Sequence, residues 1–151
     1  MGNRLIVVDT DVIIDFFRDI SPAANVFAEL ISLEKAVMTA ISVFELYAGI
    51  EGAKRLRQIE ILVQELIILP LNTLEAAIAG RIYTQLKSRG KLVDTHDILI
   101  AAICLANDLP LYTKNIAHFS EIKDIRLLSP NEILSSETSH DLRQSRRLEK
   151  P

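Results

Sequence analysis

Acidic and amide side chains recur along the chain next to apolar segments, where they could act together. They are Asp9 with Asp11, Glu45, Asp94 with Asp97, and the Thr113-Lys114-Asn115 segment. Carboxylates that are brought together repel one another, so such a cluster is stable only where protons are shared or a cation is bound. Carboxylate and amide oxygens suit Mg²⁺ or Mn²⁺, and the chain lacks the His and Cys spacing of a zinc site. The residues therefore indicate a divalent-metal site.

Short apolar runs that alternate with helical segments predict how these residues are positioned. The predicted strands are Leu5 to Val8, Ala36 to Thr39, Pro110 to Thr113 and Ile125 to Leu128, with Ile67 to Leu71 as a possible further strand. Four of the predicted helices are Val12 to Arg18, Leu56 to Leu66, Leu74 to Leu86 and Ile98 to Leu105. A further helix is predicted with Ser21 as its N-cap and Pro22 as its first residue, and another is predicted to begin at Ser42.

This alternation predicts an α/β fold, a three-layer α/β/α sandwich with a central parallel sheet. In such a sheet, ligand sites lie beyond the carboxyl ends of the strands. Asp9 and Asn115 follow predicted strands and would lie at that edge. Glu45 and Asp97 would project from the first turns of helices that could face the same edge.

Helix capping offers a second explanation for several of these acids. Ser42 and Glu45 have the spacing of a capping box, in which Glu45 only returns a hydrogen bond to the helix start. Asp94 could cap the helix that follows it, with Asp97 favoured near the positive end of that helix. The acids taken together favour a functional site over capping alone. Each of them adjoins an apolar core segment at a point where this topology could bring them together.

Size and composition predict one domain. The chain has 151 residues, of which 49% are hydrophobic, which is enough for one substantial core. We expect a domain over residues 1–134 and a polar, disordered tail over 135–151. The net charge is −3, so any contact with nucleic acid must be local or bridged by cations.

The single cysteine and the short apolar runs predict a cytoplasmic protein. Cys104 cannot form an internal disulfide, which fits a reducing compartment, and it is expected to be a small buried hydrophobe. Apolar stretches stay below the length that spans a bilayer. We therefore expect no contact with a membrane.

Four segments carry a resemblance to a known family. They are Val7 to Asp15 (VVDTDVIID), Ser42 to Gly49 (SVFELYAG), Asp94 to Ala102 (DTHDILIAA) and Leu111 to Phe119 (LYTKNIAHF). In content, order and approximate spacing they resemble the motifs of the PIN-domain ribonucleases, and in particular the VapC-type toxins of VapBC toxin–antitoxin systems. The combination is far more specific than any one segment.

The resemblance implies a PIN-like fold and an endoribonuclease that depends on Mg²⁺ or Mn²⁺. Asp9, Glu45 and Asp97 would be catalytic metal ligands. Thr113 would orient a ligand or a water, and the uncharged Asn115 would occupy the fourth catalytic position of the family. Asp94 remains open between a second metal ligand and the helix cap.

The resemblance also implies partners. They are an RNA substrate, a small antitoxin whose helix and extended tail cover an apolar groove and the acidic site, and a second copy of the chain in a homodimer formed by helices near the second motif. Four basic residues either contact RNA at the rim of the site or belong to a solvated surface: Lys87, Arg89, Lys91 and Lys114.

The remaining polar residues of these motifs are expected to have structural roles. Thr10 or Asp11 would cap the first helix, and Asp15 would be solvated or form an ion pair. The histidines are weak candidates for catalysis: His96 would point off the face of Asp94 and Asp97, His118 would be structural, and His140 lies in the tail.

Alternative functions remain open. A phosphatase of the haloacid dehalogenase type would use Asp9 and Asp11 as nucleophile and acid, but it leaves Glu45 without a role. A receiver domain needs a phosphoacceptor aspartate at the end of a middle strand, which neither Thr39 nor Leu71 supplies. A PIN domain retained only as a binding module would keep the fold without cleaving RNA.

Overall fold

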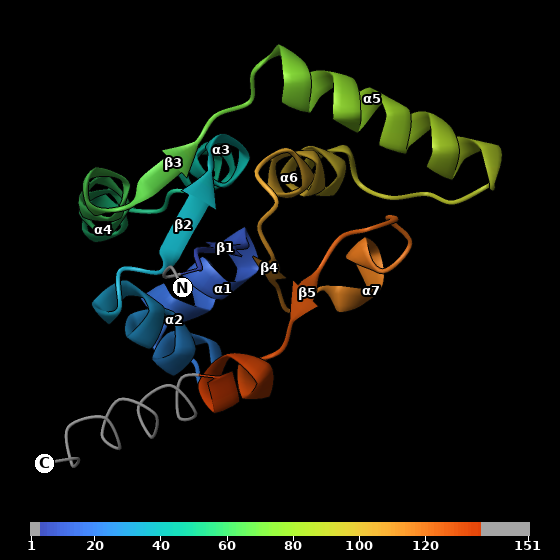
Figure 1. The fold of residues 1–151 in the computed structure, drawn as a ribbon. Coiled ribbons are helices and arrows are strands. Elements are labelled where there is room, and N and C mark those ends of the chain that lie inside the picture. The colour runs from blue at the N-terminus through green and yellow to red at the C-terminus, as the bar shows by residue number, and fades with distance from the viewer. Residues whose placement is uncertain (1–3, 137–151) are drawn as a thin grey trace, which may run out of the picture.

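A parallel sheet forms the centre of the molecule in the computed structural model, which describes residues 4–136 (Figure 1). Within these residues its strands are β1 (Ile6–Val8), β2 (Ala36–Thr39), β3 (Ile67–Leu69), β4 (Leu111–Tyr112) and β5 (Leu127–Leu128). Their order is β3-β2-β1-β4-β5, and all neighbouring strands are parallel. Every residue of β1 and β2 is buried, as expected for apolar strands covered on both faces.

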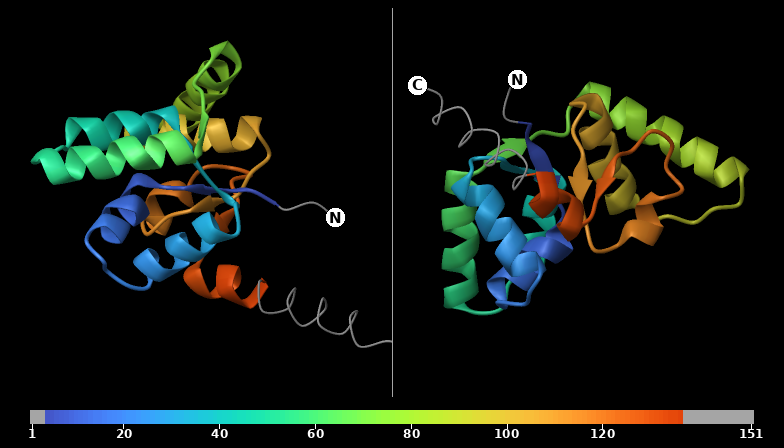
Figure 2. Two further views of the ribbon diagram at one scale, coloured as in Figure 1. Left: turned by 90° about the vertical axis from the view of Figure 1, so that its left-hand side faces the viewer. Right: turned by 60° about the horizontal axis from the view of Figure 1, so that its bottom comes forward.

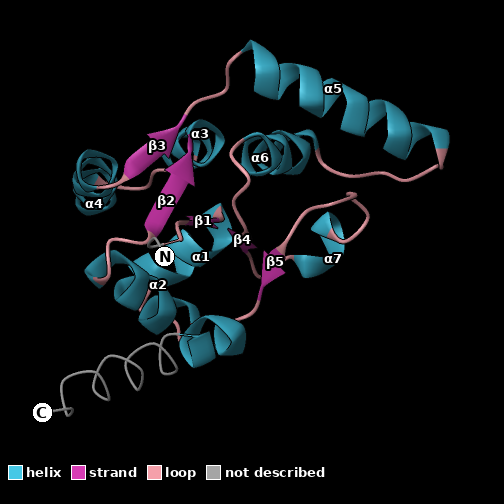
Figure 3. Cartoon of the chain, in the orientation of Figure 1, coloured by secondary structure: helices cyan, strands magenta, loops and turns pink. Residues whose placement is uncertain are grey.

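Helices cover both faces of this sheet (Figures 2 and 3). They are α1 (Thr10–Phe17), α2 (Ala23–Ser32), α3 (Ala40–Ala48), α4 (Ala53–Glu65), α5 (Thr73–Ser88), α6 (Thr95–Ala106) and α7 (Ile116–Phe119). A further helical segment occupies residues 130–136. In Figure 1, α5 and α6 lie above β1 and β4, and α1 and α2 lie below β2.

Two apolar cores separate the layers, because successive strand residues point to opposite faces. Ile6 and Val8 belong to the core that contains α1, α2 and α4. Val7, between them, belongs to the core that contains α5 and α6. The predicted three-layer sandwich with a central parallel sheet is therefore confirmed. Cys104 is fully buried in the second core, as predicted, and burial raises the pKa of its thiol to about 12.

Helices α2 and α3 are capped differently from the prediction. Helix α2 begins at Ala23, and its N-cap is Pro22 rather than Ser21, with no side-chain capping hydrogen bond. Helix α3 begins at Ala40 rather than at Ser42, because the Thr39 hydroxyl accepts a hydrogen bond from the Ser42 amide at 3.1 Å. Thr39, the last residue of β2, is thus the N-cap, and the strand passes directly into the helix.

The C-terminal tail was predicted to begin at residue 135. The helical segment over residues 130–136 includes Ser135 and Ser136, and the rest of the predicted tail lies outside the described residues. Among the residues described, none of the helices has the length and apolar character needed to cross a membrane.

Candidate active site

Asp9 is the central carboxylate of the site and lies where β1 passes into α1. It is the N-cap of α1, and its Oδ1 accepts a hydrogen bond from the Thr10 amide at 2.8 Å. Its Oδ2 accepts one from the Thr113 hydroxyl at 2.7 Å. Thr113 follows β4, the neighbour of β1, so the two carboxyl ends meet as parallel strands require. The cap of α1 is Asp9, and the prediction of Thr10 or Asp11 was wrong.

Burial and like charge both act on Asp9, whose side chain is only slightly exposed. Burial, followed by the charge of Asp11, raises the pKa of Asp9 to about 7, although hydrogen bonds from Thr113 and Thr10 oppose the shift. The charge of Asp97, on the first turn of α6, adds to the increase. These carboxylates are therefore close enough to repel one another in the folded protein.

Glu45 projects from α3 toward the start of α1. Its Oε1 accepts a hydrogen bond from the Thr10 hydroxyl at 2.8 Å, and its Oε2 lies 3.7 Å from Nδ1 of His96. The capping-box explanation for Glu45 is wrong, because Thr39 caps the helix and Ser42 lies inside it. The Glu45 side chain is instead held between α1 and α6.

Asp97 and Asp94 lie at the start of α6. Oδ2 of Asp97 is 3.1 Å from Nδ1 of His118, which comes from α7. Burial raises the pKa of Asp97, and the hydrogen bond and charge of His118 oppose this shift. Asp94 is the N-cap, because its Oδ1 accepts a hydrogen bond from the His96 amide at 2.8 Å, so the capping explanation is confirmed for this residue.

The loop after β4 is attached to α1 by several contacts. The Lys114 amide donates to Oδ2 of Asp11 at 3.1 Å, and the Lys114 ammonium forms an ion pair with Asp15. The Asn115 amide donates to the Thr113 hydroxyl at 3.0 Å, while the Asn115 side chain is exposed at the start of α7. Asp15 is a buried ion-pair partner, one of the two predicted roles.

The other predicted RNA-contacting residues lie along the end of α5 and the loop that follows it. Lys87, Arg89 and Lys91 are exposed. Arg89 and Lys91 lie 4.0 and 3.4 Å from the carboxylate of Glu121. Lys114 is instead paired with Asp15 of α1, so the predicted RNA-contacting residues have different ion-pair partners.

Comparison with known proteins identifies the family. The PIN domain family model matches residues 6–125. The chain belongs to the PIN domain family. Ribonuclease VapC1 of Methanocaldococcus jannaschii is 32% identical over 130 residues, covering 81% of this chain and 84% of that protein. Ribonuclease VapC19 of Mycobacterium tuberculosis is 30% identical over 121 residues, covering 80% of this chain and 96% of that protein.

A solved structure agrees with this PIN domain at the level of the fold. The DNA-bound VapBC structure from Salmonella typhimurium matches with a TM-score of 0.73 at 23% identity, covering 84% of this chain and 98% of that chain. Family and fold together favour the PIN domain over the haloacid dehalogenase and receiver alternatives. The strand order, with its reversal between β1 and β4, places Asp9 and Thr113 at adjacent strand ends.

The predicted ligands of this PIN domain are negatively charged oxygen donors, which are suited to binding a hard divalent cation. Asp9, Asp97 and Glu45 supply oxygen ligands of the kind that Mg²⁺ and Mn²⁺ prefer. A cation would also relieve the repulsion that contributes to the raised pKa of Asp9. Over residues 4–136, however, no three or more His, Cys, Asp or Glu side chains are already grouped as a metal site. The PIN domain thus presents the donors without a completed ligand shell.

Sequence reasoning missed several residues that contact the predicted ligands. Thr10 bonds Glu45, His118 bonds Asp97, and Asp11 holds the loop after β4. His96 was expected to point off the face of Asp94 and Asp97, yet its Nδ1 lies 3.9 Å from Oδ1 of Asp94 and 3.7 Å from Oε2 of Glu45. Because Thr10 follows Asp9 directly in the sequence, a role for Thr10 in the site could have been predicted. The spacing of apolar residues gives no indication that His118 contacts α6.

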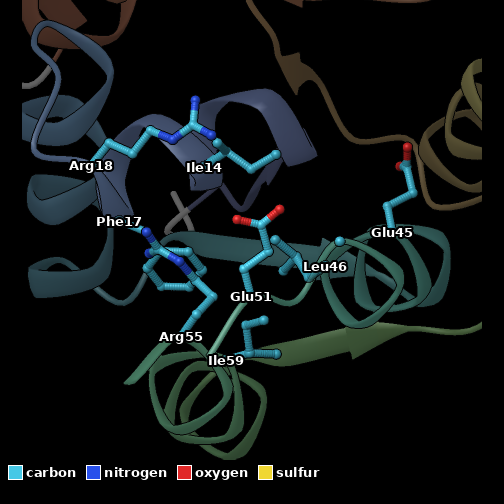
Figure 4. Close-up of a pocket in the computed structure, with 9 residues that line it drawn as sticks. Ile14, Phe17, Arg18, Glu45, Leu46, Glu51, Arg55 and Ile59 are labelled. Atoms are coloured by element: carbon cyan, nitrogen blue, oxygen red, sulfur yellow. The ribbon is translucent and has the colours of Figure 1, made fainter. Parts of the chain in front are cut away.

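A pocket of about 350 Å³ adjoins the site between α1 and the α3–α4 pair (Figure 4). Its lining residues are Ile14, Phe17, Arg18, Glu45, Leu46, Gly49, Glu51, Arg55 and Ile59. The Arg55 guanidinium lies 4.8 Å from the centre of the Phe17 ring. Glu45 lies at one end of this pocket, so the pocket reaches one of the predicted catalytic carboxylates.

Proposed function

We propose that this protein is a metal-dependent endoribonuclease that acts as the toxin of a type II toxin–antitoxin module. The observation that carries the nuclease proposal is the placement of Asp9 and Glu45 around Thr10, whose backbone amide donates to Oδ1 of Asp9 and whose hydroxyl donates to Oε1 of Glu45. Carboxylates that different elements hold side by side are the arrangement that a divalent cation stabilises. The relatives named ribonuclease VapC support RNA as the substrate class.

Asp9, Asp97 and Glu45 are the residues that would hold Mg²⁺ or Mn²⁺, with Asp94 as a further candidate at the exposed side. The metal, when bound, activates a water and neutralises phosphate charge. Thr113 keeps the Asp9 carboxylate oriented through its hydroxyl. If Glu45 acts as the general base instead of as a metal ligand, it would accept the proton of the attacking water at a carboxylate oxygen. In-line attack at phosphorus would then leave a 5′-phosphate and a 3′-hydroxyl.

The test is RNA cleavage with Mg²⁺ or Mn²⁺ by the wild type, Asp9→Asn and Asp97→Asn. Each substitution removes a charge at nearly constant shape, so we expect a rate loss of about 10²-fold or more with the fold intact. Wild-type cleavage by Asp97→Asn would refute the site assignment. The alternative of a PIN domain that only binds predicts no cleavage by the wild type with any RNA or metal tested.

The exposed basic residues at the end of α5 and in the loop that follows it are proposed to contact RNA phosphates at the rim. Replacing Lys87, Arg89 and Lys91 together with Gln should raise KM and weaken its dependence on salt concentration, while kcat stays close to the wild-type value. Lys114→Gln is a separate variant, because Lys114 is paired with the buried Asp15. An unchanged salt dependence in the triple variant would assign these side chains to the solvated surface alone.

An antitoxin is proposed to occupy the pocket between α1 and the α3–α4 pair. Apolar side chains such as Ile14 and Ile59 share this pocket with Arg18, Glu51 and Arg55, so a partner segment with both apolar and charged groups would fit. It would also reach Glu45 and cover the acidic site.

The antitoxin contact is testable by co-expression with the antitoxin. Glu51→Arg fills the pocket with a bulky cation beside Arg18 and Arg55, and should weaken antitoxin binding by about 10-fold or more. Glu60→Arg, exposed on α4, is the matched control that should bind normally. Equal binding by both variants would place the antitoxin elsewhere.

We further propose a homodimer in which α3 contributes to the contact. Phe44 and Tyr47 of this helix are 57% and 41% exposed, and large exposed aromatic side chains are typical of association surfaces.

A further inference from the structure

Polar side chains behind Glu45 form a buried group that the proposed function leaves without a role. Thr39 and Ser42 have no exposed surface, and Thr10 is 7% exposed. The three hydroxyls come from the end of β2, from inside α3 and from the start of α1. Burying a hydroxyl away from water is unfavourable unless it is hydrogen-bonded, so their contacts should be specific.

The contacts run in one direction toward Glu45. The Thr10 and Ser42 hydroxyl oxygens are 2.9 Å apart, and the Thr39 and Ser42 hydroxyl oxygens are 3.4 Å apart. Thr10 Oγ1 is 2.8 Å from Oε1 of Glu45. An ionised carboxylate has no proton to give, so Thr10 must donate to Glu45. The single Thr10 proton is then used, and Ser42 must donate to Thr10.

The same proton count continues to Thr39. Once Ser42 has donated its proton to Thr10, its oxygen can only accept in the contact with Thr39. The Thr39 oxygen in turn accepts from the Ser42 amide at 3.1 Å, which fixes its place at the start of α3. Each donor in such a chain polarises the next, so the last hydrogen bond, the one to the carboxylate, is strengthened.

We propose that this hydroxyl relay, from Thr39 through Ser42 to Thr10, holds the Glu45 carboxylate in the catalytic orientation and makes Thr10 a positioning residue. The inference rests on the proposed function for its catalytic consequence. Glu45 needs such support because it lines the adjoining pocket, and its other oxygen makes a longer contact, of 3.7 Å, to Nδ1 of His96. Without the relay, the side chain can turn into that pocket. A small displacement of a catalytic group is known to reduce rates by up to about 10²-fold.

The test compares Thr10→Val, which keeps the shape and removes the hydroxyl, with Thr10→Ser, which keeps the hydroxyl. We expect Thr10→Val to lower kcat by about 10–100-fold with KM within about 2-fold. Thr10→Ser should restore most of the rate, and Ser42→Ala should give an intermediate loss. Thr84→Val removes an exposed hydroxyl on α5 that donates to the Gly80 carbonyl, and should cleave as the wild type does.

A double-mutant cycle in metal-free protein gives a readout that does not depend on cleavage. Thr10→Val should lower the Tm of the wild type more than that of Glu45→Ala, by about 2 °C or more, because the hydrogen bond is already lost in the second background. If the wild type fails to cleave RNA but this coupling is present, the proposed function fails and the contact stands. Additive Tm changes, or wild-type kcat in Thr10→Val, would overturn the positioning role.

Discussion

At the scale of single residues, burial decides how the acids of the site titrate. The pKa of Asp9 is raised to about 7, first by burial and then by the charge of Asp11. In an unfolded chain an aspartate titrates near about 4. Between these two pH values the folded, metal-free protein binds more protons than the unfolded one. The contribution of Asp9 to the stability of the folded protein therefore falls as the pH rises from about 4 to about 7.

Asp9→Asn should remove this pH dependence, because the amide carries no charge at either end of the range. In the presence of a chelator at pH 7.5, we expect the variant to have a Tm about 3–10 °C above that of the wild type. At pH 4 the two proteins should unfold at similar temperatures. Mn²⁺ at pH 7.5 should raise the Tm of the wild type more than that of the variant. A Tm difference that is the same at both pH values would contradict the explanation by charge.

His118 should act on Asp97 through a single hydrogen bond. Removing it in His118→Leu takes away the contact that opposes the raised pKa of Asp97, so the carboxylate becomes a poorer ligand. We expect Mn²⁺ affinity to fall by about 10-fold, as is common when a hydrogen-bond partner of a metal ligand is lost. His118→Asn offers a donor near the position of Nδ1 and should recover most of the affinity. Equal Mn²⁺ affinity in His118→Leu and the wild type would show that His118 does not support Asp97 as a metal ligand.

At the scale of the elements, α1 organises the loop between β4 and α7. Asp9, Asp11 and Asp15 are spaced so that each contacts this loop, through Thr113, the Lys114 amide and the Lys114 ammonium respectively. The first of these contacts belongs to the site, and the other two fix the loop that carries it. Lys114 is therefore a structural residue as well as a candidate RNA contact.

Lys114→Met should destabilise the protein, because it leaves the buried Asp15 without its counter-charge. Since Lys114 is itself half exposed, we expect a loss of about 1–3 kcal/mol, measured by denaturant unfolding. Arg89→Met is the control, because the side chains of Arg89 and Glu121 are 51% and 39% exposed and such surface pairs contribute at most about 1 kcal/mol. Adding Asp15→Asn to Lys114→Met should recover part of the stability, and the absence of recovery would argue against the ion pair.

At the scale of the whole molecule, the topology brings distant acids to one place. The chain runs from β1 outward to β2 and β3, then returns to the other side of β1 for β4 and β5. The direction reverses between β1 and β4, and crevices at such reversals are the usual ligand sites of open parallel sheets. Asp9 and Thr113 lie at the two strands that flank this point.

The molecule as a whole should be a dimer in solution. With Phe44 and Tyr47 exposed on α3, we expect light scattering to give twice the chain mass of 16.9 kDa at micromolar concentration. Tyr47→Glu places a charge in the proposed contact and should shift the protein toward the monomer. Tyr83→Glu, on α5, is a second exposed tyrosine for comparison. A wild type that remains monomeric at about 100 µM would exclude this dimer.

Local sequence determined much of the fold and the identity of the acids. Leu5 to Val8, predicted as a buried strand, corresponds to β1, and its run of apolar residues without alternation reflects cover on both faces. The motif around Asp94 predicted the helix α6 and offered its cap as one of two roles for Asp94. These features depend on neighbouring residues alone, which is why composition and spacing were sufficient.

Tertiary structure alone decided which side chains support the acids. The hydrogen-bond partner of Glu45 depends on where α3 begins: either the start of its own helix or the Thr10 hydroxyl. Because Thr39 is the N-cap, α3 begins at Ala40, and Glu45 accepts a hydrogen bond from Thr10. The pairing of His118 with Asp97 depends on how α7 packs against α6, and that of Lys114 with Asp15 on how the β4 loop crosses α1. Such contacts join segments far apart in the chain, and periodicity reports only the environment of each segment, not the partner it will meet.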